Sequence, residues 1–357
     1  MKNKKTEKQA INSIGMFDSS KGILMLFVVL AHSMSMFFKF WEVEPKQSIF
    51  MLPLAVLKIF VYGVIPMFFM MSGYGFRKQN MKKCIKQRMH YLIKPYLCVA
   101  LVVVILTVVK RILTHGSIID ALKYQGFPFL LGLCPGETFV FGWYTASIGP
   151  VWFLMALALA WILLNWMFHI ENEVIRLITM VSIIALVIQL PFYSFVPFCF
   201  LQSICCMGFI YIGYHIKKKH LLTYKFATQT YIIFILILAY SFLFGWVDVS
   251  QNVWQLGFFD YIASCISGYF LLRMSVKLEC YEGKLIQVLR FLGKNSLYIL
   301  GVHTVEYLVF PWDRLIGKVT SNVLMSIILL MATRVIVISI GCVGVKIIIK
   351  LFRKKRA

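Results

Sequence analysis

Two ionisable side chains lie eleven residues apart in the first apolar segment of the chain, Lys21 before Gly22 and His32 before Ser33. Eleven steps of about 100° return an α-helix to within about 20° of its starting direction. Lys21 and His32 are therefore predicted to share one helix face, roughly 16 Å apart along the axis. An ionisable side chain at bilayer depth is costly and marks a functional site by default. We expect the chemistry of the protein on this face.

The side-chain types on this face are suited to acid–base chemistry beside an anion. A neutral imidazole such as that of His32 can take a proton from a hydroxyl group as a general base. Lys21 is predicted to be a fixed cation for an anionic group such as a phosphate, and Asp18, three residues earlier, to orient it. Structural roles are the alternatives. His32 could bond between helices, and Lys21 could extend to the cytoplasmic interface.

The elements that must position these residues are apolar helices. Of the 357 residues, 60% are hydrophobic and 14% are charged, whereas soluble domains average about 45–50% apolar and about 25% charged residues. The predicted fold class is all-α, a polytopic integral membrane protein with about ten transmembrane helices. The predicted spans lie near residues 22–40, 51–75, 95–113, 151–168, 175–191, 197–214, 226–246, 257–275, 296–312 and 321–349.

The net charge of +23 follows the connections between these spans. Basic segments alternate along the chain, and residues 77–94 alone hold seven Lys or Arg. This pattern fits the positive-inside rule, so it places both termini in the cytoplasm and does not indicate nucleic-acid binding. We predict a cytoplasmic basic N-terminal arm at 1–21, a transmembrane domain at 22–349 and a basic cytoplasmic tail at 350–357.

Other polar residues inside the predicted spans need partners. The nine cysteines show no CxxC or other metal spacing, so no metal site is predicted. His303 and Glu306 lie three residues apart on one helix face, a spacing that allows contact. Arg334 lies well inside the last span, where it could pair with a carboxylate such as Glu306 or line a cavity. Lys58 in the second span has no evident partner and is predicted to face the bundle interior or to reach the outer interface.

Five segments follow one another in a recognisable order. They are Phe17-Asp18 to His32-Ser33, Phe68-Phe69-Met70-Met71-Ser72-Gly73-Tyr74, Arg88 to Pro95-Tyr96, Gly149-Pro150-Val151-Trp152-Phe153-Leu154, and Phe291 to Tyr298 followed by His303. This order resembles the membrane acyltransferase-3 family, in which a basic residue, ten intervening residues and a histidine form the best-known motif. The lysine form of that motif, with Asp before it and Gly after it, resembles the branch of fucose 4-O-acetylase-like sugar O-acetyltransferases.

The resemblance implies transfer of an acyl group, usually acetyl from the co-substrate acetyl-CoA, to a hydroxyl of a cell-surface or lipid-linked carbohydrate. It implies a multi-pass protein in the plasma membrane of a bacterium. His32 would be the catalytic histidine and Lys21 its motif partner, while Arg88 would hold phosphates of CoA. Many members carry a second arginine three positions later, where this chain has Tyr91. Trp152, Ser72 and His303 are candidate contacts to the acceptor. Their alternative roles are an interfacial anchor for Trp152, helix packing for Ser72 and a structural hydrogen bond for His303.

Two mechanisms and one rival function follow from these residues. In direct transfer, His32 deprotonates the acceptor hydroxyl, which attacks the thioester carbonyl; a route through an acetylated His32 is equally open at this stage. The rival is a proton-coupled secondary transporter that uses the intramembrane His, Arg and Lys residues. No repeated pair of Gly- or Pro-broken spans, typical of transporter sites, supports it. The sequence predicts neither the acceptor sugar nor the oligomeric state.

Overall fold

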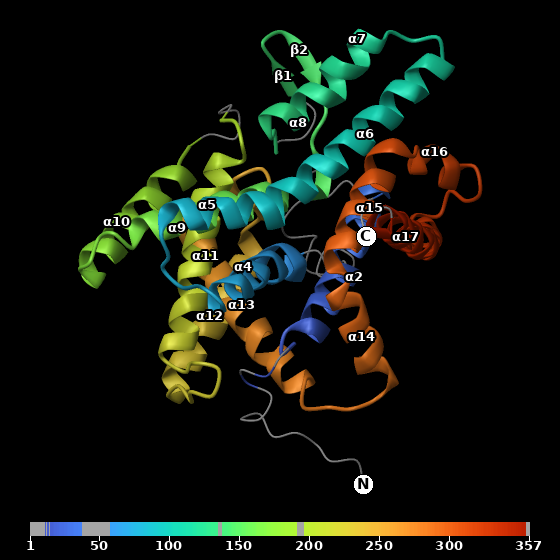
Figure 1. The fold of residues 1–357 in the computed structure, drawn as a ribbon. Coiled ribbons are helices and arrows are strands. Elements are labelled where there is room, and N and C mark those ends of the chain that lie inside the picture. Colours follow the sequence, from blue (N-terminus) through green and yellow to red (C-terminus); the bar gives the residue numbers. More distant parts are fainter. Residues whose placement is uncertain are drawn as a thin grey trace.

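The computed structural model describes residues 11, 13, 15–37, 58–134, 138–190 and 196–354, and this part of the chain is mostly helical (Figure 1). Parts of the predicted arm, tail and spans lie outside the described residues, namely 1–10, 12, 14, 38–40, 51–57, 191 and 355–357. The long helices are α2 (Asp18–Phe37), α6 (Lys94–Leu113), α9 (Trp152–Met167), α10 (Glu173–Ile188), α11 (Phe200–Lys218), α12 (Thr228–Phe244), α13 (Phe258–Leu278), α15 (Ser296–Val309) and α17 (Val323–Lys354).

Shorter elements connect or extend these helices. The π-helix η3 (Phe60–Val64) leads into α4 (Ile65–Tyr74), and α5 (Met81–Arg88) continues through η4 (Met89–Ile93) into α6. The remaining helical elements are α7 (Ile118–Ala121), η5 (Leu122–Gly126), α8 (Phe127–Leu131), η6 (Gly149–Val151), α14 (Lys284–Lys294) and α16 (Trp312–Gly317). Two antiparallel hairpins depart from the all-α prediction, β1 (Thr138–Val140) with β2 (Trp143–Thr145), and β3 (Val247–Asp248) with β4 (Val253–Trp254).

The membrane character of the fold is clear from its helices. Four helical stretches in the described residues are long and apolar enough to cross a membrane, Asp18–Met36, Met81–Leu113, Gly149–Met167 and Val323–Leu351. Three shorter apolar helices are Val61–Tyr74, Thr228–Phe244 and Ser296–Val309. Each predicted span overlaps a helix in its described part. The number of ten spans and the cytoplasmic position of both termini remain predictions.

The closest helix pairing fixes the start of α2. Gly22 on α2 faces α14, where an added Cβ would lie 2.0 Å from the carbonyl oxygen of Leu289. On α14, a Cβ at Gly293 would lie 1.7 Å from the carbonyl oxygen of Asp18. Small residues allow this approach, which favours dispersion contacts between membrane helices. Any larger residue at either glycine would separate the helices, so this pairing holds the turn that carries Lys21.

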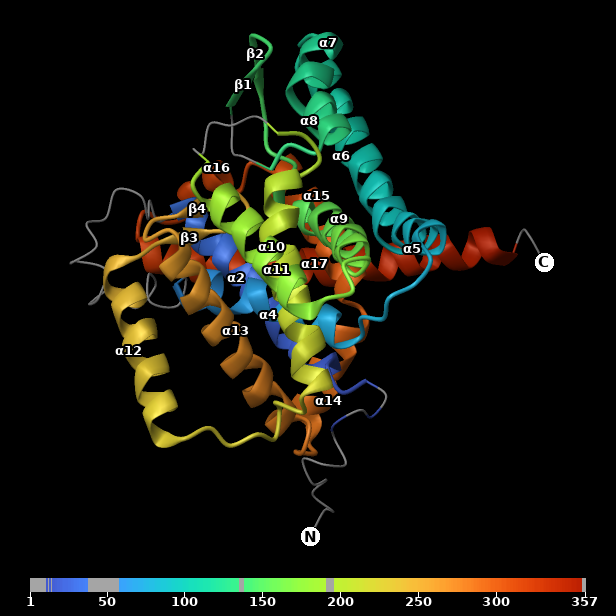
Figure 2. The same ribbon diagram turned by 90° about the vertical axis from the view of Figure 1, so that its left-hand side faces the viewer.

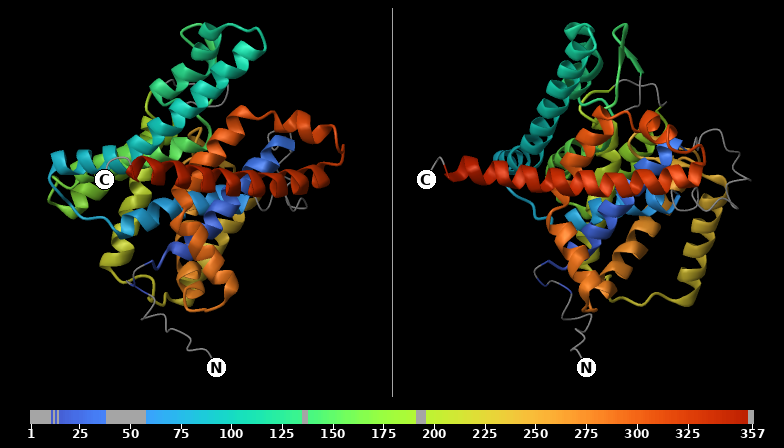
Figure 3. Two further views of the ribbon diagram at one scale, coloured as in Figure 1. Left: turned by 45° about the vertical axis from the view of Figure 1, so that its right-hand side comes forward. Right: turned by 90° about the vertical axis from the view of Figure 1, so that its right-hand side faces the viewer.

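Helix α17 has an unusual direction in the bundle. Figures 2 and 3 show it running crosswise to α12 and α13. It packs against α2 and α15, and at Gly341 an added Cβ would meet Val302 of α15 at 2.6 Å. The crossing brings the middle of α17 against the half of α2 that carries His32.

The two hairpins lie at helix ends. β1–β2 lies with α7 and α8 beside the far end of α6, at the top of Figure 1. β3–β4 connects α12 to α13, with Val247 paired to Trp254 and Asp248 to Val253. The turn of this second hairpin borders the cavity described next.

Candidate active site

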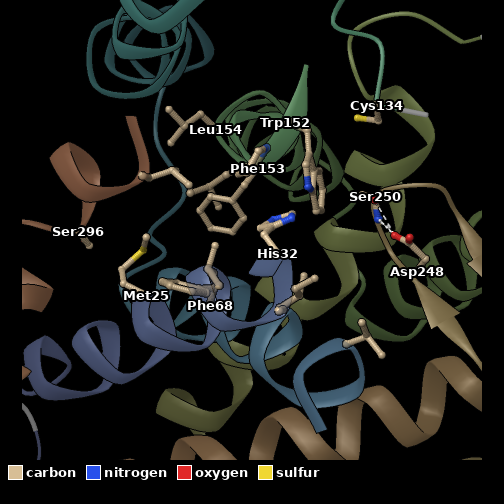
Figure 4. A pocket seen from close by; sticks show the side chains of 18 of the residues that line it. Met25, His32, Phe68, Cys134, Trp152, Phe153, Leu154, Asp248, Ser250 and Ser296 are labelled. Atoms are coloured by element: carbon tan, nitrogen blue, oxygen red, sulfur yellow. Dashed lines mark hydrogen bonds between the residues drawn. The ribbon is translucent and has the colours of Figure 1, made fainter. Parts of the chain in front are cut away.

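A cavity of about 970 Å³ lies between α2, α4, α9, α15 and the β3–β4 hairpin. Lys21 and His32 both line it, which confirms that they share one face of α2. Figure 4 shows Met25 and Ser296 on one side of His32, and Asp248 and Ser250 on the other. We call the part beside Lys21 the lysine end and the part beside Asp248 the aspartate end.

At the lysine end, Lys21 is held in the first turn of α2. Its Nζ lies 3.5 Å from Oδ1 of Asp18, and 40% of the lysine side chain is exposed. The predicted contact between the two residues is therefore present. Ser19, beside them, donates from its backbone N–H to Glu279 at 2.9 Å, and Arg290 Nε pairs with the same carboxylate at 2.8 Å. These contacts tie the start of α2 to the end of α13 and to α14.

His32 lies at the middle of the cavity with its ring partly exposed to it. The rings of His303 and Tyr307 from α15 pack behind it, with centroids 5.4 and 4.8 Å from that of His32. No hydrogen bond to either nitrogen of His32 is present within the described part of the chain. The imidazole is thus supported by aromatic rings while its nitrogens stay available to a substrate.

Behind His32 lies a buried polar cluster. His303 Nδ1 is 2.5 Å from Oε1 of Glu306, and Arg334 Nε is 3.3 Å from Oε2 of the same residue. The side chains of His303 and Arg334 are wholly buried, at 0% exposure. Arg334 also donates from Nη1 to Ser33 Oγ at 3.0 Å, beside His32, and Trp312 Nε1 donates to Glu306. The contact that the spacing allowed between His303 and Glu306 is present, and of the two alternatives for Arg334 the structure has the pairing with Glu306.

His303 does not line the cavity, although the sequence suggested that it contacts the acceptor. Its side chain is fully buried, and its Nε2 has no hydrogen-bond partner among the described residues. His303 therefore lies behind His32 as seen from the cavity, so any effect it has on a substrate is indirect and acts through the position of His32.

Arg88 lies at the end of α5 and outside the lining of the cavity. Its guanidinium stacks over the ring of Trp161 with 4.2 Å from Cζ to the ring centroid. Trp161 in turn donates from Nε1 to Ser72 Oγ at 2.6 Å, and Ser72 lines the cavity. Leu92, one turn after Arg88, lines it as well. The basic loop thus reaches the cavity through Trp161 and Leu92.

Trp152 lines the cavity from the first turn of α9. The preceding turn η6 contains Pro150, whose fixed φ suits the start of a helix. Trp246, Ser147, Ser250 and Gln251 line the cavity as well. Ser250 and Gln251 lie in the β3–β4 turn, which brings polar groups to a wall otherwise made of apolar helices.

Lys58 lies apart from this cavity, whereas one of the nine cysteines, Cys134, lines it (Figure 4). Lys58 Nζ donates to the backbone oxygen of Phe242 at 2.6 Å, which satisfies the buried ammonium in the bundle. Among the described residues, no group of three His, Cys, Asp or Glu side chains is arranged to hold a metal ion.

Comparison with known proteins places the chain in a family. A family model described as an acyltransferase domain, acyltransferase-3, matches residues 15–349. The chain belongs to the acyltransferase-3 family. No curated protein matches it, nor does any solved structure. The protein is therefore an acyltransferase of the membrane.

In an acyltransferase, the acyl donor and the acceptor must bind so that their reacting atoms come into contact. The sequence predicted His32 as the catalytic residue, but it did not single out Asp248 and Tyr307, which line the cavity, or Trp161, which contacts Ser72 beside it. A signal was present for Asp248, because it is one of only 14 acidic residues and lies in a polar turn between two apolar segments. Trp161 gave no such signal, since an aromatic residue within an apolar helix is unremarkable in sequence.

Proposed function

We propose that this acyltransferase moves an acetyl group from acetyl-CoA to a hydroxyl group of a cell-surface or lipid-linked carbohydrate. The observation that carries the proposal is that Lys21 and His32 line one cavity. Lys21 lies in the first turn of α2 and His32 in the second half of the same helix. A cation at one end and a base at the centre match a polyanionic donor with a reactive thioester. The proposed location is the plasma membrane of a bacterium, and the proposed branch is that of fucose 4-O-acetylase-like enzymes.

The donor is proposed to enter at the lysine end. Lys21 is sufficiently exposed to meet a phosphate, and Asp18 orients its ammonium. Arg88 is proposed to hold a second phosphate at the edge of the cavity, because its stacked guanidinium keeps its planar donors fixed. Its Nε is buried and has no hydrogen-bond partner within the described chain. The thioester would then extend past Met25 toward His32.

His32 is proposed to act as the general base. One imidazole nitrogen takes the proton from the acceptor hydroxyl as the hydroxyl oxygen attacks the thioester carbonyl carbon. The C–S bond then breaks, and the imidazolium returns the proton to the departing thiolate of CoA. His303 is proposed as a positioning residue that keeps the ring of His32 in place, with Glu306 and Arg334 fixing His303.

The decisive experiment measures acetyl transfer by purified protein in lipid nanodiscs with labelled acetyl-CoA and surface glycans. His32→Ala should remove transfer, a loss of about 10²-fold or more, whereas His169→Ala, an exposed loop histidine, should not. Lys21→Ala should weaken binding of acetyl-CoA. Full transfer by the His32→Ala protein would overturn the mechanism. Rapid quenching and peptide mass spectrometry would detect an acetyl group on His32 if the two-step route operates.

The family identifies an acyltransferase, so the transporter alternative is not proposed. A proton-coupled transporter would need a path for protons through the buried ionisable residues. In the described part of the chain, the carboxylate of Glu306 is instead engaged by His303, Arg334 and Trp312.

A further inference from the structure

The two ends of the cavity carry opposite charges. Among its described lining residues, Lys21 is the only lysine or arginine and Asp248 is the only carboxylate. The two lie on different elements, α2 and the β3–β4 hairpin. Figure 4 shows Asp248 on the side of His32 opposite Met25, which follows Lys21 by one helical turn. The proposed function explains the cation but leaves the carboxylate without a role.

The carboxylate of Asp248 is fixed by its own turn. Its Oδ1 accepts from the backbone N–H of Ser250 at 2.9 Å, from Ser250 Oγ at 2.5 Å and from the backbone N–H of Gln251 at 3.2 Å. Its Oδ2 accepts from Gln251 Nε2 at 3.0 Å. An ionised carboxylate has about four lone-pair positions, so Oδ2 keeps acceptor capacity for another hydroxyl group. The polar groups of the turn are held in place before any ligand arrives.

Burial raises the pKa of the Asp248 carboxyl, and the hydrogen bonds from Ser250 and Gln251 oppose this rise because they stabilise the ionised form. No lysine or arginine among the described lining residues lies at this end to balance its charge. A fixed negative charge in a cavity with apolar walls acts strongly on another charge, because the local dielectric constant is low. An anionic group at this end would be repelled, whereas hydroxyl groups could donate to Asp248 and to the side-chain carbonyl of Gln251.

The aromatic lining suits the same kind of ligand. Trp152 and Trp246 both line the cavity, and Figure 4 shows Trp152 beside His32. Indole combines a large apolar surface with one N–H donor, so it can cover the C–H face of a sugar ring while hydroxyl groups at the ring edge meet polar side chains. Fixed acceptors, apolar aromatic surface and net negative charge together describe a site for an uncharged polyhydroxyl ligand.

We propose that the aspartate end of the cavity binds an uncharged sugar unit of the acceptor, and that Asp248 selects against acceptors with a carboxylate or phosphate near the reacting hydroxyl. This inference rests on the proposed function, because it names the acceptor class of the same site. It also predicts the ends of the cavity at which the donor and the acceptor bind. The phosphates of the donor are attracted to Lys21 and repelled by Asp248, so the two substrates meet at His32 from opposite ends.

The test compares two oligosaccharides that differ in one charge, a glucose oligomer and its counterpart with glucuronic acid at the terminal unit. Their binding to the protein in nanodiscs is followed through tryptophan fluorescence, and their acetylation through label from acetyl-CoA. The neutral oligomer should bind at least about tenfold more tightly, since like charges at a binding site are strongly disfavoured. Asp248→Asn should reduce this preference, and Asp248→Lys should reverse it.

Two control variants separate charge from folding. Asp120→Asn removes an exposed carboxylate from α7 and should leave the preference unchanged. Ser250→Ala removes one hydrogen bond but keeps the Asp248 carboxylate, so it should retain the preference even if Asp248 variants fold poorly. Equal binding of the two oligomers, preference for the acidic one, or binding of neither would overturn the inference.

The two proposals fail differently. Selective binding of the neutral oligomer without any acetyl transfer would contradict the proposed function and leave the selectivity intact. Acetyl transfer with a preference for the acidic oligomer would support the function and refute the role of Asp248.

Discussion

Two clusters of this protein each contain a glutamate, a histidine and a basic side chain, arginine in one and lysine in the other, in different surroundings. In the buried cluster behind His32, Glu306 contacts His303 and Arg334 at 2.5 and 3.3 Å. In the second, at the start of α10 and the end of α11, Glu173 lies 3.7 Å from His215 Nε2 and 2.8 Å from Lys218 Nζ. We call the second group the rim cluster. The distances are similar, but the exposure is not.

Burial decides what each cluster can do. The Glu306 side chain is 2% exposed, whereas Glu173 is 43% exposed. Water solvates the charges of the rim cluster whether or not they pair, so its ion pair is expected to contribute little. The charges of the buried cluster have no such alternative, and loss of one partner leaves the other unpaired in an apolar medium. Equal contact geometry therefore predicts unequal effects of substitution.

The largest effect is expected for Glu306→Gln. This change keeps the shape of the side chain but leaves the Arg334 guanidinium without a carboxylate. Removal of one partner from a buried pair costs about 3–5 kcal/mol of folding stability, measured here by thermal or denaturant unfolding in detergent. The matched change Glu173→Gln in the rim cluster is the control. Equal stability of the two variants would contradict the importance assigned to burial.

The next effect is on catalysis and concerns His303→Gln. Glutamine can still meet Glu306, but it does not reproduce the ring that packs against His32. Misplacement of a reacting group by about 1 Å can cost about 10²-fold in rate. We expect kcat to fall by about that factor while KM for acetyl-CoA stays unchanged, because Lys21 lies at the other end of α2. A change in KM with kcat unchanged would show that His303 instead acts in donor binding.

A smaller change is expected when both charges of the buried pair are removed. Replacement of a buried ion pair by apolar residues of similar volume is often neutral or stabilising. The double variant Glu306→Leu with Arg334→Met should therefore unfold closer to the wild-type protein than Glu306→Gln does. The coupling is read from a double-mutant cycle with the single changes. Additive losses would indicate that the two side chains do not share one interaction.

The sequence predicted contacts where helix spacing or the demand of a buried charge for a partner applies. A spacing of three residues in a helix places His303 beside Glu306, and a spacing of eleven residues places Lys21 and His32 on one helix face. The pairing of Arg334 with Glu306 follows from the demand of a buried cation for an acceptor, since few carboxylates exist in the apolar segments. The apolar segments themselves mark the helices because only a helix satisfies its backbone within lipid.

Other features depend on packing that no local rule contains. The crosswise direction of α17 results from its contacts with α2 and α15, and apolarity alone does not fix such a direction. The approach of Arg88 to the cavity runs through Trp161, which is 73 positions further along the sequence. Asp248 lines the cavity because it belongs to the β3–β4 hairpin, which connects α12 to α13. These three placements could be established only from the folded structure, because they depend on contacts between segments far apart in the sequence.

The smallest effect is expected for Glu173→Gln in the rim cluster. The hydrogen bond from Lys218 lowers the pKa of the Glu173 carboxyl below its usual range. A lowered pKa means that any stabilisation is present at neutral pH and is lost as the pH falls through the pKa of the folded state. Because the pair is exposed, salt near physiological strength should screen it. The unfolding temperature of the variant should equal that of the wild-type protein in such salt.

At low ionic strength, a slight advantage of the wild-type protein should emerge at neutral pH and vanish in acid. The measurement is a series of unfolding scans across pH at two salt concentrations, with Lys218→Gln as the reciprocal variant. Both variants should lose the same small advantage, because each removes one side of a single pair. A large, salt-independent loss in either would mean that the rim cluster is shielded from water by lipid, and that the distinction between the two clusters lies in their contacts and not in their burial.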